Sequence, residues 1–412
     1  MGKRKKRCCA IRWGTYGDLL YALPVLEILK KKYGYLHLET TTRGMELFRW
    51  NPTFDRISAI DIGQWKASEW ETISKLRWTL LQQEVEWDRT VNFWRCLEYA
   101  CIPEEHQIEW HWEREKRRQM FAEKNFYDEH FKRADIPVPP PDQFDCGTMY
   151  FQEDTAEWAR YFKHKYRDRF IVAMPLAGST GQKVPQVLYR LAQMIHAEIP
   201  EVLFVLLGGH EEVQFQFSLG KGNVAHACGE YKYDQSAIVT KFADYVVGPE
   251  TSLLVMAGLF GTPKSMLCTS SGYTQTTAYQ KNDFSTNSTA PCSPCYRAIY
   301  DQRICPLEKG DWGEMQVCNF HFDLNRVMEG VRFAYEVRQL RRSIDSLAGT
   351  KFGSLPDLRP LFDHGLSATI DIQRYVSQRV HPKGEDPSGE THQQGTVVPC
   401  SEVYFHKSGQ DS

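Results

Sequence analysis

The chain has 412 residues, of which 42% are hydrophobic and 25% charged, and its formal net charge at pH 7 is −2. This length indicates two domains, and the near-neutral charge argues against a globally basic protein that binds nucleic acid. No apolar run reaches the roughly 18 residues that a membrane span needs, and Arg12 interrupts the short apolar run near the N-terminus, so we expect neither a membrane helix nor a signal peptide.

Two compositional features bear on where the protein works. The basic run from Lys3 to Arg7 either forms a solvated tail or is weakly attracted to an anionic membrane face. Twelve cysteines in a long chain without a secretory signal favour a reduced, cytoplasmic protein over a disulfide scaffold.

The first part of the chain alternates between short apolar runs and amphipathic segments. The patterns predict strands at 8–13, 35–42, 54–62 and 87–94, and helices at 18–32, 43–50 and 66–86. Pro24 lies inside the first helix, where we expect a kink or an early break. The charged segment 104–133, with interleaved aromatic residues, is either an amphipathic helical excursion or a lid over an acceptor. This alternation indicates a parallel sheet covered on both faces.

The proline-rich segment 135–143 predicts a linker, after which the alternation starts again. We expect strands at 169–175 and 201–209, helices at 185–199 and 323–345, and a strand-turn-helix-turn-strand unit over 243–268. The predicted domains are 1–160 and 161–347, followed by a largely disordered tail over 348–412 that is rich in Gly, Ser, Pro, His and Gln.

Three turns of the second half follow predicted strands, where ligands bind in open α/β sheets. In "PLAGSTGQKVPQ", Ser179, Thr180 and Lys183 suit a phosphate, although a flexible polar loop has the same composition and the spacing is not that of a Walker A loop. In "LLGGHEE", Gly208 permits the close approach of either a ligand or a packed helix.

The third turn, "VGPETSLLVMAG", places Glu250, Thr251 and Ser252 at the start of a helix. Thr251 and Ser252 are ordinary capping residues. The same helix start is also suited to hold a diphosphate, with Glu250 on a sugar hydroxyl, because it carries about half a unit of positive charge.

The stretch "IRWGTYGDLL" places Asp18 where the first strand turns into a helix. Taken by itself, Asp18 is most simply a helix-start residue that the helix dipole favours.

Together these stretches resemble glycosyltransferase family 9, the heptosyltransferases of bacterial lipopolysaccharide core assembly. The resemblance rests on "IRWGTYGDLLYALPVLEILKKKYG", "PLAGSTGQKVPQ", "VLFVLLGGHEE" and "FADYVVGPETSLLVMAGLFGTPK", together with the cysteine segment from Pro291, in that order over most of residues 8–335. It implies an α/β fold of the GT-B type, with two facing Rossmann-like domains. The activity it implies is inverting transfer of a hexose-like or heptose sugar from a nucleotide-diphosphate sugar to a glycan hydroxyl.

The resemblance also implies roles for single residues. The catalytic Gly-Asp pair of the family falls on Gly17 and Asp18, so Asp18 is the expected general base, facing a pyrophosphate across an interdomain gap. Arg12 matches a basic position that contacts donor or acceptor phosphate. The donor-binding residues implied are Ser179, Thr180, Lys183, Gly208, Glu250, Thr251 and Ser252.

This sequence departs from the family pattern at position 250. The family usually has aspartate followed by Thr-Gly, whereas this chain has Glu250, Thr251 and Ser252. The longer acid shifts the carboxylate by about one methylene, and the missing glycine leaves less room near the phosphates. An ADP-sugar is the favoured donor, but a donor other than ADP-heptose fits this departure equally.

Four cysteines lie close together in the sequence, at Cys292, Cys295, Cys305 and Cys318. A C-x2-C pair with two further cysteines is able to build a structural zinc site, but the second C-x2-C pair is absent, so zinc, free thiols and a disulfide all stay open. No cofactor is expected in the reaction itself.

The expected partners are a nucleotide-diphosphate sugar and a glycan or lipid-linked glycan acceptor, with peripheral contact at the inner membrane face and no nucleic acid. The alternative is a catalytically inactive protein that binds nucleotide or glycan on the same scaffold. The departures at Glu250 and Ser252 are the sequence features that favour this alternative.

Overall fold

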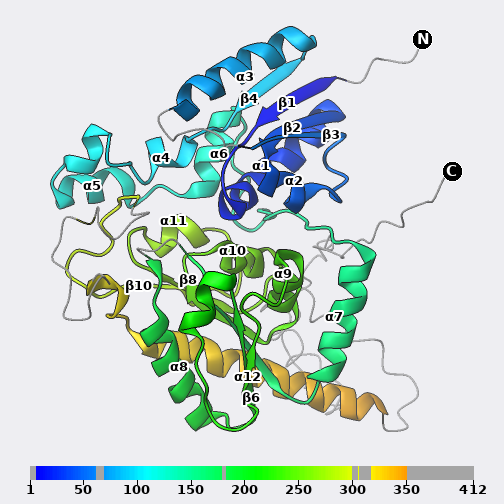
Figure 1. Cartoon of the computed structure of the whole chain (residues 1–412), viewed down its shortest axis with the longest axis vertical. Coiled ribbons are helices and arrows are strands. Elements are labelled where there is room, and N and C mark those ends of the chain that lie inside the picture. Colours follow the sequence, from blue (N-terminus) through cyan, green and yellow to red (C-terminus); the bar gives the residue numbers. More distant parts are fainter. Residues whose placement is uncertain (1–5, 62–68, 179–181, 299–304, 306–316, 350–412) are drawn as a thin grey trace, which may run out of the picture.

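The computed structural model describes residues 6–61, 69–178, 182–298, 305 and 317–349. The described chain forms two α/β halves, each built on its own sheet (Figure 1). All strand pairs within the two sheets are parallel, which confirms the fold class expected from the alternation of strands and helices.

The first sheet has four strands in the order β3-β2-β1-β4. Its strands are β1 (Arg7–Ile11), β2 (Tyr35–Thr41), β3 (Arg56–Ile60) and β4 (Arg89–Asn92). The helices of this half are α1 (Tyr16–Tyr33), α2 (Thr42–Phe48), α3 (Trp70–Glu84), α4 (Cys96–Ala100), η3 (Ile108–His111), α5 (Arg114–Phe121) and α6 (Phe126–Ala134). The predicted strands and helices of this half are confirmed. The strand order reverses between β1 and β4, and in open α/β sheets ligands bind outside the carboxyl ends of the strands at such a point.

Helix α1 continues to Tyr33, so the predicted early break at Pro24 is wrong. Proline removes one hydrogen bond from a helix interior, but this helix buries an apolar face that includes Leu19, Leu23 and Leu26, and that packing holds it together. Gly34 ends the helix in the left-handed region at φ 76°, where a residue without a side chain is favoured.

The second sheet has six strands in the order β10-β9-β8-β5-β6-β7. They are β5 (Phe170–Pro175), β6 (Val202–Leu207), β7 (Val224–His226), β8 (Tyr245–Pro249), β9 (Lys264–Cys268) and β10 (Thr286–Asn287). The helices are α7 (Glu153–Lys165), α8 (Pro185–Glu198), η5 (His210–Phe215), α9 (Tyr233–Phe242), α10 (Ser252–Leu259), α11 (Tyr273–Thr277), η7 (Val317–Asn319) and α12 (Leu324–Gly349). Every residue of β5 and β6 is buried, as expected for central strands covered on both faces. The order reverses between β5 and β8.

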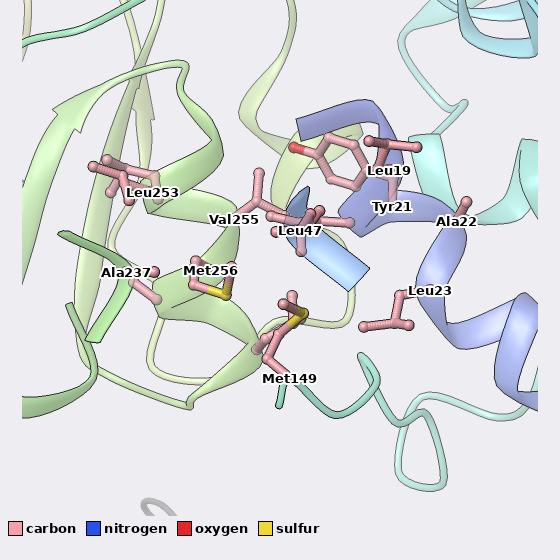
Figure 2. Close-up of a cluster of buried hydrophobic side chains, with 14 of the residues drawn as sticks. Leu19, Tyr21, Ala22, Leu23, Leu47, Met149, Ala237, Leu253, Val255 and Met256 are labelled. Carbon is pink, nitrogen blue, oxygen red and sulfur yellow. The ribbon is translucent and has the colours of Figure 1, made fainter. Parts of the chain in front are cut away.

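The two halves meet directly where α1 packs on α10 (Figure 1). Figure 2 shows the apolar side chains at this contact, with Leu19, Tyr21 and Leu23 from α1 on one side and Val255 and Met256 from α10 on the other. They belong to one cluster of buried residues that is continuous across the two halves. Burial of this apolar surface therefore fixes how the two sheets are placed relative to each other.

A second contact joins the halves through the excursion between α4 and α6. Arg117 Nε donates to the backbone oxygen of Cys295 at 2.8 Å, and Arg297 Nε donates to the backbone oxygen of Trp110 at 2.9 Å. Gln275 on α11 donates to the backbone oxygen of Phe121 at 2.9 Å. The predicted amphipathic helical excursion is confirmed as a set of short helices that ties the first half to the second.

The domain limits stay predictions. The limit at 160/161 falls inside α7, which packs on α9 of the second half. The tail predicted for 348–412 lies outside the described residues except for the end of α12. Within the part of the chain that the structure describes, no helix is long and apolar enough to cross a membrane.

Candidate active site

The carboxylate of Asp18 lies at the carboxyl end of β1, on the first turn of α1. Its Oδ2 atom accepts hydrogen bonds from the Thr15 backbone N–H at 2.8 Å and from Thr15 Oγ1 at 3.0 Å. A Cβ atom on Gly14 would lie 2.7 Å from Asp18 Oδ2, so the carboxylate occupies this place only because residue 14 is glycine. The expected helix-start role of Asp18 is thus confirmed, and the side chain keeps 26% of its surface exposed for a further role.

The side chain of Arg12 contacts that of Asp18. Its side chain is 1% exposed, and its Nη2 atom lies 3.4 Å from Asp18 Oδ1. Nη1 donates to the Trp13 backbone oxygen at 2.8 Å, which holds the guanidinium in place. A buried arginine stabilises a charged carboxylate and fixes its position, so a contact of Arg12 with a ligand phosphate, as the resemblance implies, stays a prediction.

The start of α1 lies against the second half. A Cβ atom on Gly17 would lie 3.9 Å from Ser252 Cα, at the first residue of α10. Beside this point the ring of Tyr16 stacks on that of Tyr233 from α9, with centroids 3.8 Å apart. The predicted base and the predicted phosphate-binding helix start are therefore neighbours, although they stand 234 residues apart in the chain.

The predicted donor residues of the second half follow β5, β6 and β8. Thr251 is the N-cap residue of α10, and its side chain makes no capping hydrogen bond. Gln182 Nε2 donates to Glu250 Oε2 at 3.2 Å, which joins the loops after β5 and β8 where the strand order reverses. Ser179 and Thr180 lie outside the described residues.

Lys183 is paired within the protein. Its Nζ atom lies 2.6 Å from Glu212 Oε1, and both side chains are largely buried. Glu212 Oε2 accepts from the Gly209 N–H at 2.8 Å. A Cβ atom on Gly208 would lie 2.7 Å from Glu212 Cβ, so the expected packing role of Gly208 is confirmed. A donor phosphate at Lys183 would have to share the ammonium with Glu212.

The Glu250 carboxylate is turned toward the loop after β9. Oε1 accepts from the Thr269 N–H at 3.0 Å, and Oε2 accepts from the Ser271 hydroxyl. Burial raises the pKa of Glu250, and these hydrogen bonds oppose the rise. Its predicted contact with a sugar hydroxyl stays a prediction.

Sequence reasoning missed Glu98. This residue lies on α4, which follows β4, and its Oε2 atom is buried without a hydrogen-bond partner among the residues that the structure describes. Burial raises the pKa of Glu98 to about 7; the charge of Asp18 raises it further, and that of Arg12 lowers it. The available sequence signal was a lone carboxylate just after a predicted strand, which is common and carries no motif.

The four cysteines of the cluster interact, but they do not build a metal site in the described part of the chain. The pKa of the Cys318 thiol is raised by burial and, further, by Cys292, Cys295 and Cys305. Cys292, Cys295 and Cys305 are free thiols. Among the described residues, no three His, Cys, Asp or Glu side chains lie in an arrangement that would hold a metal ion. Zinc binding stays a prediction.

A pocket opens on the other side of the Tyr16 contact, between α2, the segment 149–155 and the start of α9. Arg49, Trp50, Lys232 and Tyr233 are among its lining residues. Of the residues predicted to bind donor or acceptor, those that the structure describes do not line this pocket.

Comparison with known proteins gives structural matches only. No protein-family model and no curated protein sequence matches the chain. A family 9 glycosyltransferase from Veillonella parvula DSM 2008 is 12% identical, with a TM-score of 0.55 over 81% of this chain and 98% of that one. The E. coli ADP-heptose lps heptosyltransferase II is 14% identical, with a TM-score of 0.53 over 81% and 99%.

A third similar structure is the dodecameric iron-containing heptosyltransferase TibC from enterotoxigenic E. coli H10407, solved in complex with ADP-D-beta-D-heptose. It is 9% identical, with a TM-score of 0.50 over 81% of this chain and 77% of that one. At these sequence identities the structural similarity establishes the fold alone. The chain has the two-domain GT-B architecture of these glycosyltransferases, which confirms the fold that the sequence motifs implied.

Proposed function

We propose that this protein is an inverting glycosyltransferase that moves a heptose or another hexose-like sugar from a nucleotide-diphosphate sugar to a hydroxyl of a glycan acceptor. The observation that carries the proposal is the packing of the first turn of α1, which carries Asp18, against the start of α10, on a GT-B fold similar to that of solved heptosyltransferases. The base and the site for the leaving group then come from opposite halves.

In the proposed reaction, Asp18 accepts the proton of the acceptor hydroxyl while its oxygen attacks the anomeric carbon. The new carbon–oxygen bond forms on the face opposite the diphosphate, and the bond to the phosphate oxygen breaks with its electron pair going to the nucleoside diphosphate. The anomeric centre is therefore inverted. Proton transfer to Asp18 accompanies the attack of the acceptor oxygen, as in general base catalysis.

The leaving diphosphate is proposed to bind at the N-terminus of α10, at Thr251 and Ser252. The unsatisfied backbone N–H groups of a helix start and the helix dipole stabilise a phosphate that gains charge, so this step is proposed to need no metal. Lys183 would add a positive charge, shared with Glu212. ADP is the favoured nucleotide, because one of the similar structures was solved with ADP-D-beta-D-heptose.

The acceptor is proposed to be a glycan or lipid-linked glycan, bound at the loops that follow β1 and β4 in the first half. We further propose that the protein is cytoplasmic and makes peripheral contact with the inner membrane face. The basic run at the N-terminus supports this part of the proposal.

A second candidate is an inactive protein that binds nucleotide or glycan on the same scaffold. The observation that favours it is that Lys183 and Glu250 already have partners within the protein. Both candidates predict nucleotide-sugar binding, but only the first predicts turnover that depends on Asp18.

The test measures thermal stabilisation by ADP-, UDP-, GDP- and dTDP-sugars, and then release of the nucleoside diphosphate in the presence of a lipopolysaccharide fraction. The variant is Asp18→Asn, and the matched control is Asp55→Asn, which removes a carboxylate that pairs with Lys30 in the same half. We expect Asp18→Asn to bind the donor but to lose about 10²- to 10⁴-fold in turnover, with the control close to the wild type. Binding without any wild-type turnover would favour the inactive candidate, and no stabilisation by any donor would overturn both.

A further inference from the structure

The pocket beside the Tyr16 contact is lined by both halves of the protein. One wall is the end of α2 with the residues that follow it, the other is the start of α9, and the segment 149–155 lies between them. Its volume is about 170 Å³, below the roughly 300–1,000 Å³ of sites that enclose a drug-sized ligand, so it has room for one small ring. The proposed transfer reaction uses none of its side chains.

Two carboxylates of the pocket are held in place by hydrogen bonds from other elements. On the first wall, Glu46 Oε2 accepts from the Tyr16 hydroxyl at 2.6 Å. On the second wall, Asp234 Oδ2 accepts from the Thr155 hydroxyl at 2.6 Å. A carboxylate that accepts one such bond keeps further lone pairs for a ligand. The pocket therefore offers positioned hydrogen-bond acceptors from both halves.

The pocket also has a hydrogen-bond donor that the protein does not use. Trp50 lines it, and the Nε1 atom of this side chain is buried with no hydrogen-bond partner within the described ranges. Burying an indole N–H without an acceptor is unfavourable, so a ligand oxygen at this atom would gain a hydrogen bond that the free protein lacks. The guanidinium of Arg49 lies 5.5 Å from the Trp50 ring centroid, which helps to hold the indole in place.

The charges of the lining residues favour a neutral ligand. The carboxylates are those of Glu46, Asp154 and Asp234, and the cations are Arg49 and Lys232. An anion would be repelled by the three carboxylates, and an amine would be repelled by the two cations. A hydroxyl group fits both kinds of neighbour, because it donates to a carboxylate and accepts from an N–H group.

The pocket has an apolar part as well. Leu47, Met149 and Phe151 line it and are buried. An apolar surface with a few positioned donors and acceptors is typical of pockets that bind small polar ligands. A sugar ring matches this pattern, since its C–H groups pack on the apolar side chains while its hydroxyls form hydrogen bonds.

We propose that this pocket is a saccharide-binding site that holds one uncharged pyranose ring, in addition to the sugars of the transfer reaction. Hydroxyls of the ring donate to Glu46 and Asp234, and a ring or hydroxyl oxygen accepts from Trp50 Nε1. Because these residues come from both halves, the bound sugar bridges α2 and α9. The inference goes beyond the proposed function, since this binding requires no transfer.

The experiment is isothermal titration of the full chain with the methyl glycosides of glucose, galactose and mannose, without any nucleotide-sugar. We expect at least one of them to bind with a Kd of about 1–10 mM. Trp50→Phe keeps an aromatic ring but removes the N–H and should weaken binding about five- to tenfold. Glu46→Gln changes an exposed side chain and should weaken it about fivefold, because a charged acceptor is lost. Trp78→Phe, on α3 outside the pocket, is the matched control and should bind like the wild type.

Two further measurements decide where the sugar binds and what its chemistry is. Asp18→Asn should bind the glycoside like the wild type. Binding that is lost in Asp18→Asn but kept in Trp50→Phe and Glu46→Gln would place the sugar at the reaction site and overturn the inference. Inorganic phosphate that binds more tightly than every glycoside would overturn it as well.

The outcome is independent of the test of the proposed function. No binding of any of the three glycosides would overturn the saccharide site and leave the proposed transfer reaction standing. Glycoside binding that depends on Trp50 and Glu46, in a protein that turns over no nucleotide-sugar, would support the saccharide site and count against the transfer reaction.

Discussion

A Cβ atom on Gly17 would lie 3.9 Å from the Cα atom of Ser252, which places the first turn of α1 against the first turn of α10. These two turns carry the proposed base and the proposed phosphate site. Because the two halves touch here through backbone rather than through long side chains, the distance between the two sites depends on residue 17 being small.

Substitutions of Gly17 should separate two effects on stability, that of helix propensity and that of the contact with Ser252. Gly17→Ala has room for its methyl group and should raise the free energy of unfolding by about 0.5–1 kcal/mol, since glycine is a poor helix residue. Gly17→Leu should lower it by about 1–3 kcal/mol, because the larger side chain must move Ser252. Urea denaturation checks both. Gly330→Ala is the contrasting control and should destabilise, because a Cβ there would lie 2.3 Å from Tyr245 Oη.

Arg117 should be a main determinant of the contact between the excursion and the second half. Arg117→Ala removes the donor to the Cys295 oxygen at 2.8 Å and leaves buried carbonyl groups without a partner, so we expect a loss of about 2–4 kcal/mol. The neighbouring Arg118→Ala changes an exposed side chain and should alter stability by less than about 0.5 kcal/mol. Similar losses for the two variants, in chemical denaturation, would contradict this.

The buried pair of Lys183 and Glu212 should show coupled stability. Lys183→Met leaves a buried carboxylate without its cation and should cost about 3–5 kcal/mol. The double variant Lys183→Met/Glu212→Gln should recover most of that loss, because no unpaired charge stays buried. A double-mutant cycle of unfolding free energies measures the coupling, and strictly additive losses would show that the two side chains act independently.

Glu27 should lower the stability of the wild type as the pH rises. Burial raises the pKa of Glu27 to about 7, with Asp145 raising it further and the Thr148 N–H and Lys31 lowering it. Since the pKa in the folded protein lies above that in the unfolded chain, the stabilising contribution of protonated Glu27 is lost as pH rises from about 5 to above 7.

Glu27→Gln keeps an acceptor for the Thr148 N–H, 2.7 Å from Glu27 Oε1, and has no charge to bury. We therefore expect it to exceed the wild type by about 1–3 kcal/mol at pH 8 and to match it more closely at pH 5. Thermal unfolding across this range, with Glu123→Gln as the exposed control, checks the sign. A gain that is larger at pH 5 than at pH 8 would show the assigned direction to be wrong.

The sequence itself determined the alternation of elements and the position of Asp18. The apolar periods that predict β1, α1 and β2 are set by residues one to four positions apart, so each element is encoded locally. The Thr15 and Asp18 capping box is local in the same way, since its two residues stand three positions apart. The order of such motifs along the chain was also enough to indicate the GT-B fold.

Only the tertiary structure decided which residues meet. Ser252 reaches Gly17 because α1 packs on α10, and the loops that carry Asp18 and Glu98 leave adjacent strands because β1 and β4 pair. Lys183, which is predicted to bind a phosphate, pairs with Glu212, 29 residues further along the chain. Contacts of this kind depend on how two sheets twist and pack over long separations in the chain, and no local period in the sequence records that.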